Sequence, residues 1–380
     1  MPAELGKPHA RVNTRPPPDC EFPCPLFATP PFSHPHGNAT LHLSAPRKPR
    51  MFRRLALCLL VALLAPLAAS ADCTGQNLLD TMPAADRSAL HAAADSVPHP
   101  RGLLWRATRG DRTIHLIGTY HLDDPRHAAT LARITPLMDA ATTILVEAGP
   151  KEEAALVADL SRDPGLMVMT EGPTLREALP DAEWQVLANA MRARGLPPFM
   201  VSKIRPWYVS MLLSMPACDG AAAAAKGGLD AKVIAHATQK DIPLQALEPH
   251  ETVFRLFQSM TFEEQLGMIR SALALEPQSA DYAVTLADVY FAEEPRLIWD
   301  LTLHLSLSAP GADPATVTAD FAQMERALMT DRNRAWIPVI EAAAARGPTL
   351  AAFGALHLPG DYGVLRLLEQ AGWTVERLPL

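Results

Sequence analysis

The chain has few cysteines, with five in 380 residues. Only two of them, Cys73 and Cys218, fall in the part of the chain that we expect to fold. In an oxidising compartment two such thiols usually pair, and closing so long a loop would restrict the unfolded chain by roughly 4 to 5 kcal/mol. The sequence therefore predicts a Cys73–Cys218 disulfide, with two separate buried thiols as the alternative. A bonded pair would leave no cysteine nucleophile.

The sequence motifs of several enzyme classes are also missing. There is no G-x-S-x-G elbow, no H-E-x-x-H helix and no phosphate-cradling G-x-x-x-x-G-K, and no G-x-G-x-x-G follows the first predicted strand. The chain thus lacks the usual signatures of serine hydrolases, of one class of zinc peptidase and of nucleotide-binding domains.

A strong positive charge is absent as well. The 34 lysines and arginines are outnumbered by 41 aspartates and glutamates, which gives a formal net charge of −7. No basic stripe with interleaved aromatic residues is present, so the sequence predicts no nucleic-acid partner. The same balance argues against an electrostatic membrane anchor. The oligomeric state is left open.

One apolar run, Leu55 to Leu67, is shorter than the roughly 20 residues that a membrane-spanning helix needs. It follows Arg53-Arg54 and precedes the small residues Ala69-Ser70-Ala71, which is the layout of a secretory signal peptide. We therefore predict a signal peptide at 51–71 that is removed after Ala71. The expected product is periplasmic or secreted, with no stable membrane anchor.

Residues 1–50 precede this signal and have an unusual composition. They hold roughly a third of the 36 prolines and show no apolar period of a helix or a strand, so they are not expected to form a packed core. We interpret them as an upstream segment that is not native to the protein, with Met51 as the true start. The alternative is a real disordered extension.

The remaining chain, residues 72–380, alternates short apolar strands with longer amphipathic helices. Residues 112–150 have the pattern strand, helix, strand, which is typical of a parallel βαβ unit. The fold class that we expect is α/β (α+β), with a small, mostly parallel sheet. Helix patterns at about 151–225 and 252–346 predict large helical insertions into this domain.

Two capping boxes support the predicted helices. Thr174 is followed three residues later by Glu177, and Thr261 is followed by Glu264 in the same way. In this pattern the two side chains bind each other's backbone amide groups at a helix start. A helix is therefore expected to begin after each threonine.

Each of the four predicted core strands is followed by a histidine or a glutamate: His121, Glu147, Glu248 and His357. In an open parallel sheet the carboxyl ends of the strands share one edge, where ligands bind. We therefore expect these four side chains to converge. Two of the strands also end in the same short motif, Gly-x-x-His.

Imidazole and carboxylate groups are ligands of catalytic divalent ions such as Zn²⁺, Mn²⁺ or Co²⁺. Such an ion makes water nucleophilic near neutral pH, and a spare carboxylate can take the proton. That chemistry hydrolyses amides and esters. A glycine in each motif permits a tight turn and a close backbone approach. The alternative interpretation is structural, with each glycine ending a strand and each histidine capping a turn.

The whole region resembles the TraB/GumN family, which includes the TIKI-type metalloproteases. The matching segments are Gly118-Thr-Tyr-His121, Glu147, Gly228-Leu-Asp230, Leu247-Glu248, Arg332-Asn333, Gly354-Ala-Leu-His357 and the closing pattern from Gly354 through Val375. The resemblance implies a metal-dependent hydrolase, in particular a peptidase, that acts on a peptide or small-molecule substrate.

On this hypothesis each matching residue has an expected role. The metal ligands are His121, Glu147 and His357, the cofactor site is completed by Gly118, Asp230 and Gly354, and the catalytic residues are Glu248 as general base with Arg332 and Asn333. Arg332 has two interpretations, because it can bind the substrate or form an ion pair with Glu147 or Asp230. The alternative function is a non-catalytic binding protein that uses the same pocket.

Overall fold

The computed structural model describes residues 74–217 and 227–380, within one compact unit, Ala68–Leu380. The predicted upstream segment and the signal peptide lie outside the described residues. Cys73 and Cys218 lie outside them too, so the disulfide stays a prediction.

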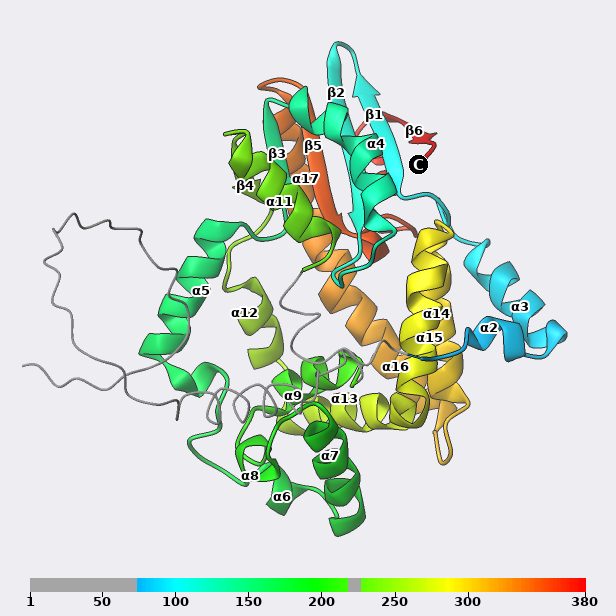
Figure 1. Ribbon diagram of the computed structural model, residues 1–380, viewed down its shortest axis with the longest axis vertical. Helices are drawn as coiled ribbons and strands as arrows, with labels where there is room; N and C mark the ends of the chain where they lie inside the picture. The colour runs from blue at the N-terminus through cyan, green and yellow to red at the C-terminus, as the bar shows by residue number, and fades with distance from the viewer. Residues whose placement is uncertain (1–73, 218–226) are drawn as a thin grey trace, which may run out of the picture. The chain divides into compact units, whose positions relative to one another are not determined.

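Within the described residues, six strands form one mixed sheet in the order β4-β3-β5-β2-β1-β6 (Figure 1). The strands are β1 (Leu104–Arg109), β2 (Arg112–Thr119), β3 (Thr143–Val146), β4 (Leu244–Ala246), β5 (Thr349–Gly354) and β6 (Thr374–Leu378). The four strands from β4 to β2 are parallel, and β1 runs antiparallel to both β2 and β6. The predicted fold class is confirmed, although β1 was not predicted.

Helices precede, connect and follow these strands. Before β4 they are α2 (Leu78–Thr81), α3 (Ala84–Ala94), α4 (His127–Asp139), α5 (Pro150–Arg162), α6 (Leu175–Ala178), α7 (Asp181–Ala193), α8 (Pro198–Val201), α9 (Pro206–Ser214) and α11 (Leu229–Gln239). After β4 they are α12 (Thr252–Gln258), α13 (Phe262–Leu275), α14 (Ser279–Phe291), α15 (Pro295–Leu307), α16 (Pro314–Glu325), α17 (Asp331–Ala344) and α18 (Val364–Gln370).

Both faces of the sheet are covered. Leu116 packs with Trp336 of α17 and Leu365 of α18, whereas the next residue, Ile117, packs with Ile134 of α4 and Val233 of α11. Successive side chains of a strand point to opposite faces, so a strand that is buried on both sides must be apolar throughout. This is why β3 and β5 are mostly apolar along their whole length, whereas β2 is apolar mainly in its buried second half.

The helices between the strands form a second core. Leu175, Trp184 and Val209 pack there with Leu266 and Ile269 of α13, and α13 lies against α9 (Figure 1). The predicted capping boxes are both present, at the start of α6 and at the start of α13. The helical parts of the chain therefore have apolar packing of their own, apart from the sheet.

The helix formed by α16 and α17 is interrupted by a π-helical turn, η3 (Arg326–Thr330). A π-turn takes an extra residue compared with an α-helix, and such turns are frequent at functional sites. Arg332 and Asn333 follow directly, at the start of α17. The turn therefore helps to determine which side chains α17 directs toward the sheet.

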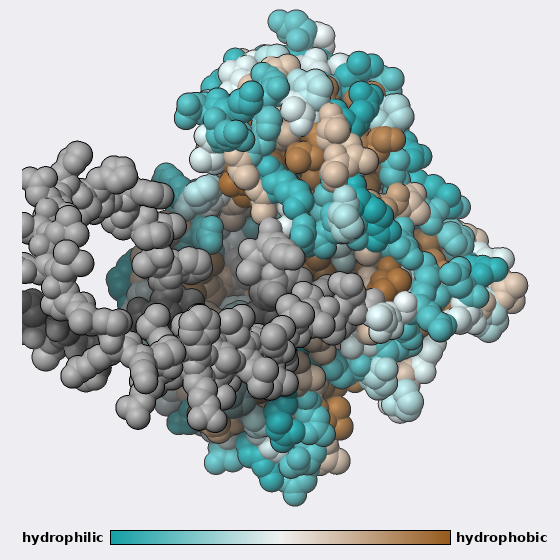
Figure 2. Space-filling view, viewed as in Figure 1, coloured by the Kyte–Doolittle hydropathy of each residue, from teal (hydrophilic) through white to brown (hydrophobic). Residues whose placement is uncertain are grey.

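No helix among the described residues is long and apolar enough to cross a membrane. On the face shown in Figure 2, hydrophobic residues form small groups between hydrophilic ones. The large apolar side chains with the greatest exposure include Phe199, at 76%, and Val157, at 57%.

Candidate functional site

The carboxyl ends of four parallel strands bring the predicted residues to one edge of the sheet. His121 follows β2, Glu147 follows β3, Glu248 follows β4 and His357 follows β5 through the short turn η4 (Ala355–His357). Because β5 pairs with both β2 and β3, the two Gly-x-x-His motifs lie on adjacent strands.

Glu147 and His121 meet at Gly354. Its N–H donates to Oε1 of Glu147 at 2.6 Å. A Cβ added at Gly354 would lie 3.3 Å from that oxygen and 3.3 Å from Nε2 of His121. The missing side chain therefore lets a carboxylate and an imidazole face each other above the end of β5.

His121 is held by a turn that begins α11. Nδ1 of His121 lies 3.2 Å from Oδ1 of Asp230, and this hydrogen bond raises the pKa of His121. Leu229 N–H donates to the carbonyl of Tyr120 at 2.9 Å. A Cβ on Gly228 would lie 1.9 Å from that carbonyl oxygen, so only glycine permits this approach.

His357 has a different environment, because it is buried. Its Nδ1 lies 2.6 Å from Oδ1 of Asn333, and Nδ2 of Asn333 donates to the carbonyl of Tyr362 at 2.9 Å. An amide oxygen only accepts, so Nδ1 carries the proton and Nε2 presents its lone pair. Burial lowers the pKa of His357 to about 4, so the ring is neutral at pH 7.

Arg332 lies among the acidic residues. Its Nη2 is 2.7 Å from Oε2 of Glu147 and 2.7 Å from Oε1 of Glu248. Its Nη1 is 3.3 Å from Nε2 of His357, and the guanidinium lies 4.9 Å from the ring centre of Trp336. Of its two interpretations, the structure shows the ion pair with Glu147, extended to Glu248.

Both carboxylates of this network are held by several donors. Glu248 also accepts a hydrogen bond from Nε1 of Trp336 at 3.0 Å. Burial alone would raise the pKa of Glu147, but His357, Arg332 and His121 lower it to about 2. At that acidic pH His357 is protonated, so it adds positive charge where Glu147 titrates.

Gly118 lies beside the site and not within it. A Cβ at Gly118 would lie 2.7 Å from Cδ1 of Leu358 and 2.9 Å from Cα of Ala355. Its lack of a side chain therefore allows the η4 turn, which carries His357, to pack on β2. Six of the other predicted residues are linked to one another by hydrogen bonds and ion pairs: Glu147, Glu248, Arg332, Asn333, Gly354 and His357. The remaining pair, His121 and Asp230, joins them through the close approach of His121 to Gly354.

Two buried side chains that sequence reasoning missed hold the His121 segment. The hydroxyl of Tyr290, from α14, donates to the carbonyl of Gly118 at 2.9 Å, and Nε2 of His127 binds the carbonyl of Leu122 at 2.9 Å. Their rings pack together with Tyr120. No sequence motif marks either residue: Tyr290 of α14 reaches the end of β2 only in the folded chain, and His127 is the first residue of α4.

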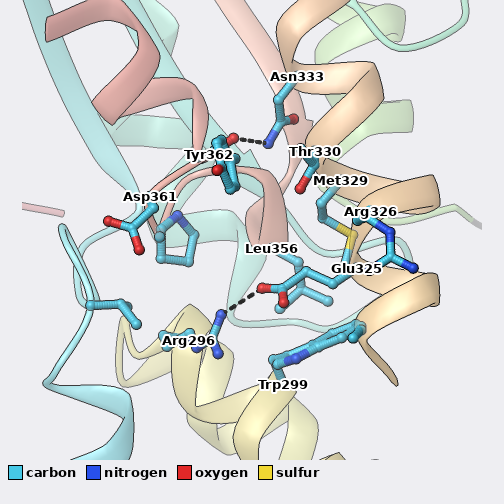
Figure 3. A pocket seen from close by; sticks show the side chains of 15 residues that line it. Arg296, Trp299, Glu325, Arg326, Met329, Thr330, Asn333, Leu356, Asp361 and Tyr362 are labelled. Atoms are coloured by element: carbon cyan, nitrogen blue, oxygen red, sulfur yellow. Dashed lines mark hydrogen bonds and ion pairs between the residues drawn. The ribbon is translucent and has the colours of Figure 1, made fainter. Parts of the chain in front are cut away.

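A cavity of about 390 Å³ lies against the turn that carries His357 (Figure 3). Its lining includes Trp299, Met329, Leu356 and Tyr362, together with the ion pair between Arg296 and Glu325. Asn333 lines the cavity as well and binds His357. The volume is within the range of small-molecule sites, about 300 to 1,000 Å³.

A family model described as the TraB/PrgY/gumN family matches residues 103–377. The chain belongs to this family. The TraB/PrgY/gumN match contains all of the candidate residues from Gly118 to His357. It thereby covers the two Gly-x-x-His motifs and the helical segments between them.

Similar proteins from two bacteria support this assignment. The uncharacterised protein YbaP of Escherichia coli K12 is 24% identical over 264 residues, which is 68% of this chain and 89% of YbaP. YbaP of Shigella flexneri has the same identity and coverage.

Proposed function

We propose that the chain is a metal-dependent hydrolase, specifically a peptidase, whose divalent ion is held by His121, Glu147 and His357. The observation that carries this proposal is the meeting of His121 Nε2 and Glu147 Oε1, each 3.3 Å from the Cβ position of Gly354. Nε2 of His357 lies 4.0 Å from the same carboxylate oxygen. Two imidazole nitrogens and one carboxylate suit Zn²⁺, Mn²⁺ or Co²⁺.

The residues fit a divalent ion in donor type and direction. Asp230 and Asn333 bind the Nδ1 atoms of the two histidines, which is how metal-binding histidines are commonly oriented. Among the described residues, no three His, Cys, Asp or Glu side chains already stand close enough to hold an ion. Since Arg332 lies among the donors, we infer that it must leave Glu147 and keep Glu248 when an ion binds.

A bound divalent ion would polarise a substrate carbonyl and acidify a water molecule. Glu248 would take the proton of that water, after Arg332 and Trp336 have fixed the direction of its carboxylate. The guanidinium of Arg332 would donate to the oxygen on which negative charge develops. Asn333 would keep the His357 ring in one orientation throughout.

The substrate of this hydrolase would be a peptide or another small molecule that reaches the cavity beside Asn333. The proposal places the reaction in the periplasm or outside the cell, because residues 51–71 have the layout of a signal peptide. That segment lies outside the described residues, so its processing needs its own test. Intact mass of the exported protein should correspond to a chain that starts at Asp72.

One observation favours the alternative, a binding protein without catalysis. Arg332 already donates hydrogen bonds of 2.7 Å to both Glu147 and Glu248. Both carboxylates therefore have hydrogen-bond partners within the protein without a metal ion. Such a protein would use the cavity beside Asn333 to sequester a peptide or small ligand.

Elemental analysis separates the two proposals. The purified protein should contain about one divalent ion per chain, and H121A and H357A should each lose both the ion and the hydrolytic activity. E248Q should keep the ion and lose most of the rate, because glutamine retains the shape of glutamate but not its basicity. If H121A and H357A bind divalent ions as tightly as the parent protein, the shared site is refuted.

A further inference from the structure

Thr119, the second residue of the first Gly-x-x-His motif, has a hydroxyl that the described fold does not use. The side chain is 3% exposed, and Oγ1 has no hydrogen-bond partner among the described residues. A buried polar group without a partner lowers the stability of the fold. An unpaired buried hydroxyl at the end of β2, two residues before His121, therefore requires an explanation.

The direction of this hydroxyl follows from the ladder between β2 and β5. Thr119 is the register partner of Gly354, and side chains of register partners leave a sheet on the same face. A Cβ on Gly354 would point at His121 Nε2 and Glu147 Oε1. Since neighbouring strands are about 4.8 Å apart, the side chain of Thr119 stands next to the meeting point of these two donors.

The packing of neighbouring residues confirms that Thr119 and Gly354 lie on the same face of the sheet. Ile117, two residues before Thr119, shares an apolar cluster with Ala352, which precedes Gly354 by two. The two buried side chains that bind this segment, Tyr290 and His127, use the carbonyls of Gly118 and Leu122. Neither of them therefore engages the hydroxyl of Thr119.

We propose that Thr119 is a further ligand-binding residue of this site and that its hydroxyl oxygen faces the divalent ion. This inference rests on the metal-dependent function proposed above. A hydroxyl is a hard oxygen donor, and harder ions such as Mn²⁺ prefer oxygen ligands more strongly than Zn²⁺ does. Thr119 therefore shifts the preference of the site toward Mn²⁺.

The test compares variants that keep or remove the hydroxyl. T119V has nearly the same shape without the oxygen, and T119S keeps the oxygen. The matched control is T143V, because Thr143 is also buried in the parallel sheet but starts β3, at the opposite edge from the site. Metal-free full-length protein is titrated with Mn²⁺ and with Zn²⁺ by calorimetry.

We expect T119V to weaken Mn²⁺ binding by about tenfold or more, which is roughly 1.4 kcal/mol, and to weaken Zn²⁺ binding less. T119S and T143V should bind both ions as the parent protein does. In EDTA, T119V should unfold at the same denaturant concentration as the parent or a higher one, because valine removes an unpaired hydroxyl.

Three outcomes would overturn this assignment. If T119V binds both ions as the parent does, Thr119 is not part of the site, although the proposed function stands. If T119V is as destabilised in EDTA as it is impaired in binding, the hydroxyl is structural. If the parent protein binds neither ion, both this inference and the proposed metal site are wrong.

Discussion

His121 and His357 end the same short motif on adjacent parallel strands, yet their surroundings differ. The His121 side chain is 64% exposed and pairs with Asp230, while the His357 side chain is 6% exposed and packs 4.4 Å from the ring centre of Trp336. The pKa of His121 is raised, and the pKa of His357 is lowered to about 4. One spacing has therefore produced a basic imidazole and a neutral one.

The difference shows what Gly-x-x-His specifies and what it leaves to other residues. The motif delivers a histidine to the end of a strand. The partner of each imidazole comes from elsewhere: for His121 it is Asp230, more than a hundred residues away, and for His357 it is Asn333 of α17. In the proposed metal site, the buried His357 would be the more firmly positioned ligand and the exposed His121 the one with more freedom to adjust.

The largest expected loss of stability comes from removing Arg332, which lies next to His357. R332A should destabilise the protein by about 3 to 5 kcal/mol, because it leaves Glu147 and Glu248 charged and without their shared cation. Denaturant unfolding in EDTA measures this loss. R366A is the control, since Arg366 pairs with Glu369 at the surface, and it should cost less than about 1 kcal/mol. A loss below that value in R332A would contradict the network.

The two histidines should respond to pH with opposite signs. The pKa of His357 is about 4 in the folded chain against 6.5 in the unfolded chain, so its stabilisation is complete above pH 6.5 and is lost as the pH falls toward 4. The loss is on the order of 2 to 3 kcal/mol. The free energy of unfolding of the metal-free protein, determined at pH 7.5 and at pH 4.5, measures this loss. In H357Q the difference between the two values should be smaller. If H357Q loses as much stability between pH 7.5 and pH 4.5 as the parent protein does, a group other than His357 is responsible for the loss.

Removing the hydroxyl of Tyr290 should have a smaller effect, and it should act on the first Gly-x-x-His motif alone. Y290F removes the hydrogen bond to the carbonyl of Gly118 and should cost about 1 kcal/mol. In NMR spectra it should shift the ring signals of His121 much more than those of His357. Y282F is the control, because Tyr282 is bonded to Thr302 and should alter stability alone. Equal shifts at both histidines would show that Tyr290 does not act on one motif.

The smallest effect concerns His121 itself. Because Asp230 raises its pKa above 6.5, its contribution is complete below pH 6.5 and is lost as the pH rises through the raised value. The side chain is largely exposed, so the contribution should be well below 1 kcal/mol. Denaturant unfolding of the two metal-free proteins measures this contribution. The free energies of unfolding of the parent protein and of H121Q should differ more at pH 6 than at pH 8.5. A larger difference at pH 8.5 would reverse the sign and refute the ion pair.

Local patterns were enough to predict much of the fold. Capping boxes and apolar runs are determined by neighbouring residues, so the starts of α6 and α13 and the strands from β2 to β5 were predictable. β1 was not, because Leu104–Arg109 mixes apolar residues with two arginines, and its pairing with β2 and β6 is decided only in the folded sheet.

The site was predictable where it depends on strand ends and unpredictable where it depends on helix packing. The convergence of His121, Glu147 and His357 follows from parallel strands. That Arg332 bridges two carboxylates depends on the register of α17 after η3, which spacing does not reveal. The orphan hydroxyl of Thr119 could be recognised only once the hydrogen bonds of its neighbours were known.

The central place of β5 in the sheet has a consequence for biosynthesis. β2 and β3 are consecutive along the chain, but β5, which lies between them in the sheet, is made about 200 residues after β3. Pairing strands so far apart in sequence first costs the entropy of closing a long loop. A growing chain therefore carries His121 and Glu147 on strands with no common neighbour, and the two side chains can converge only after β5 has been made.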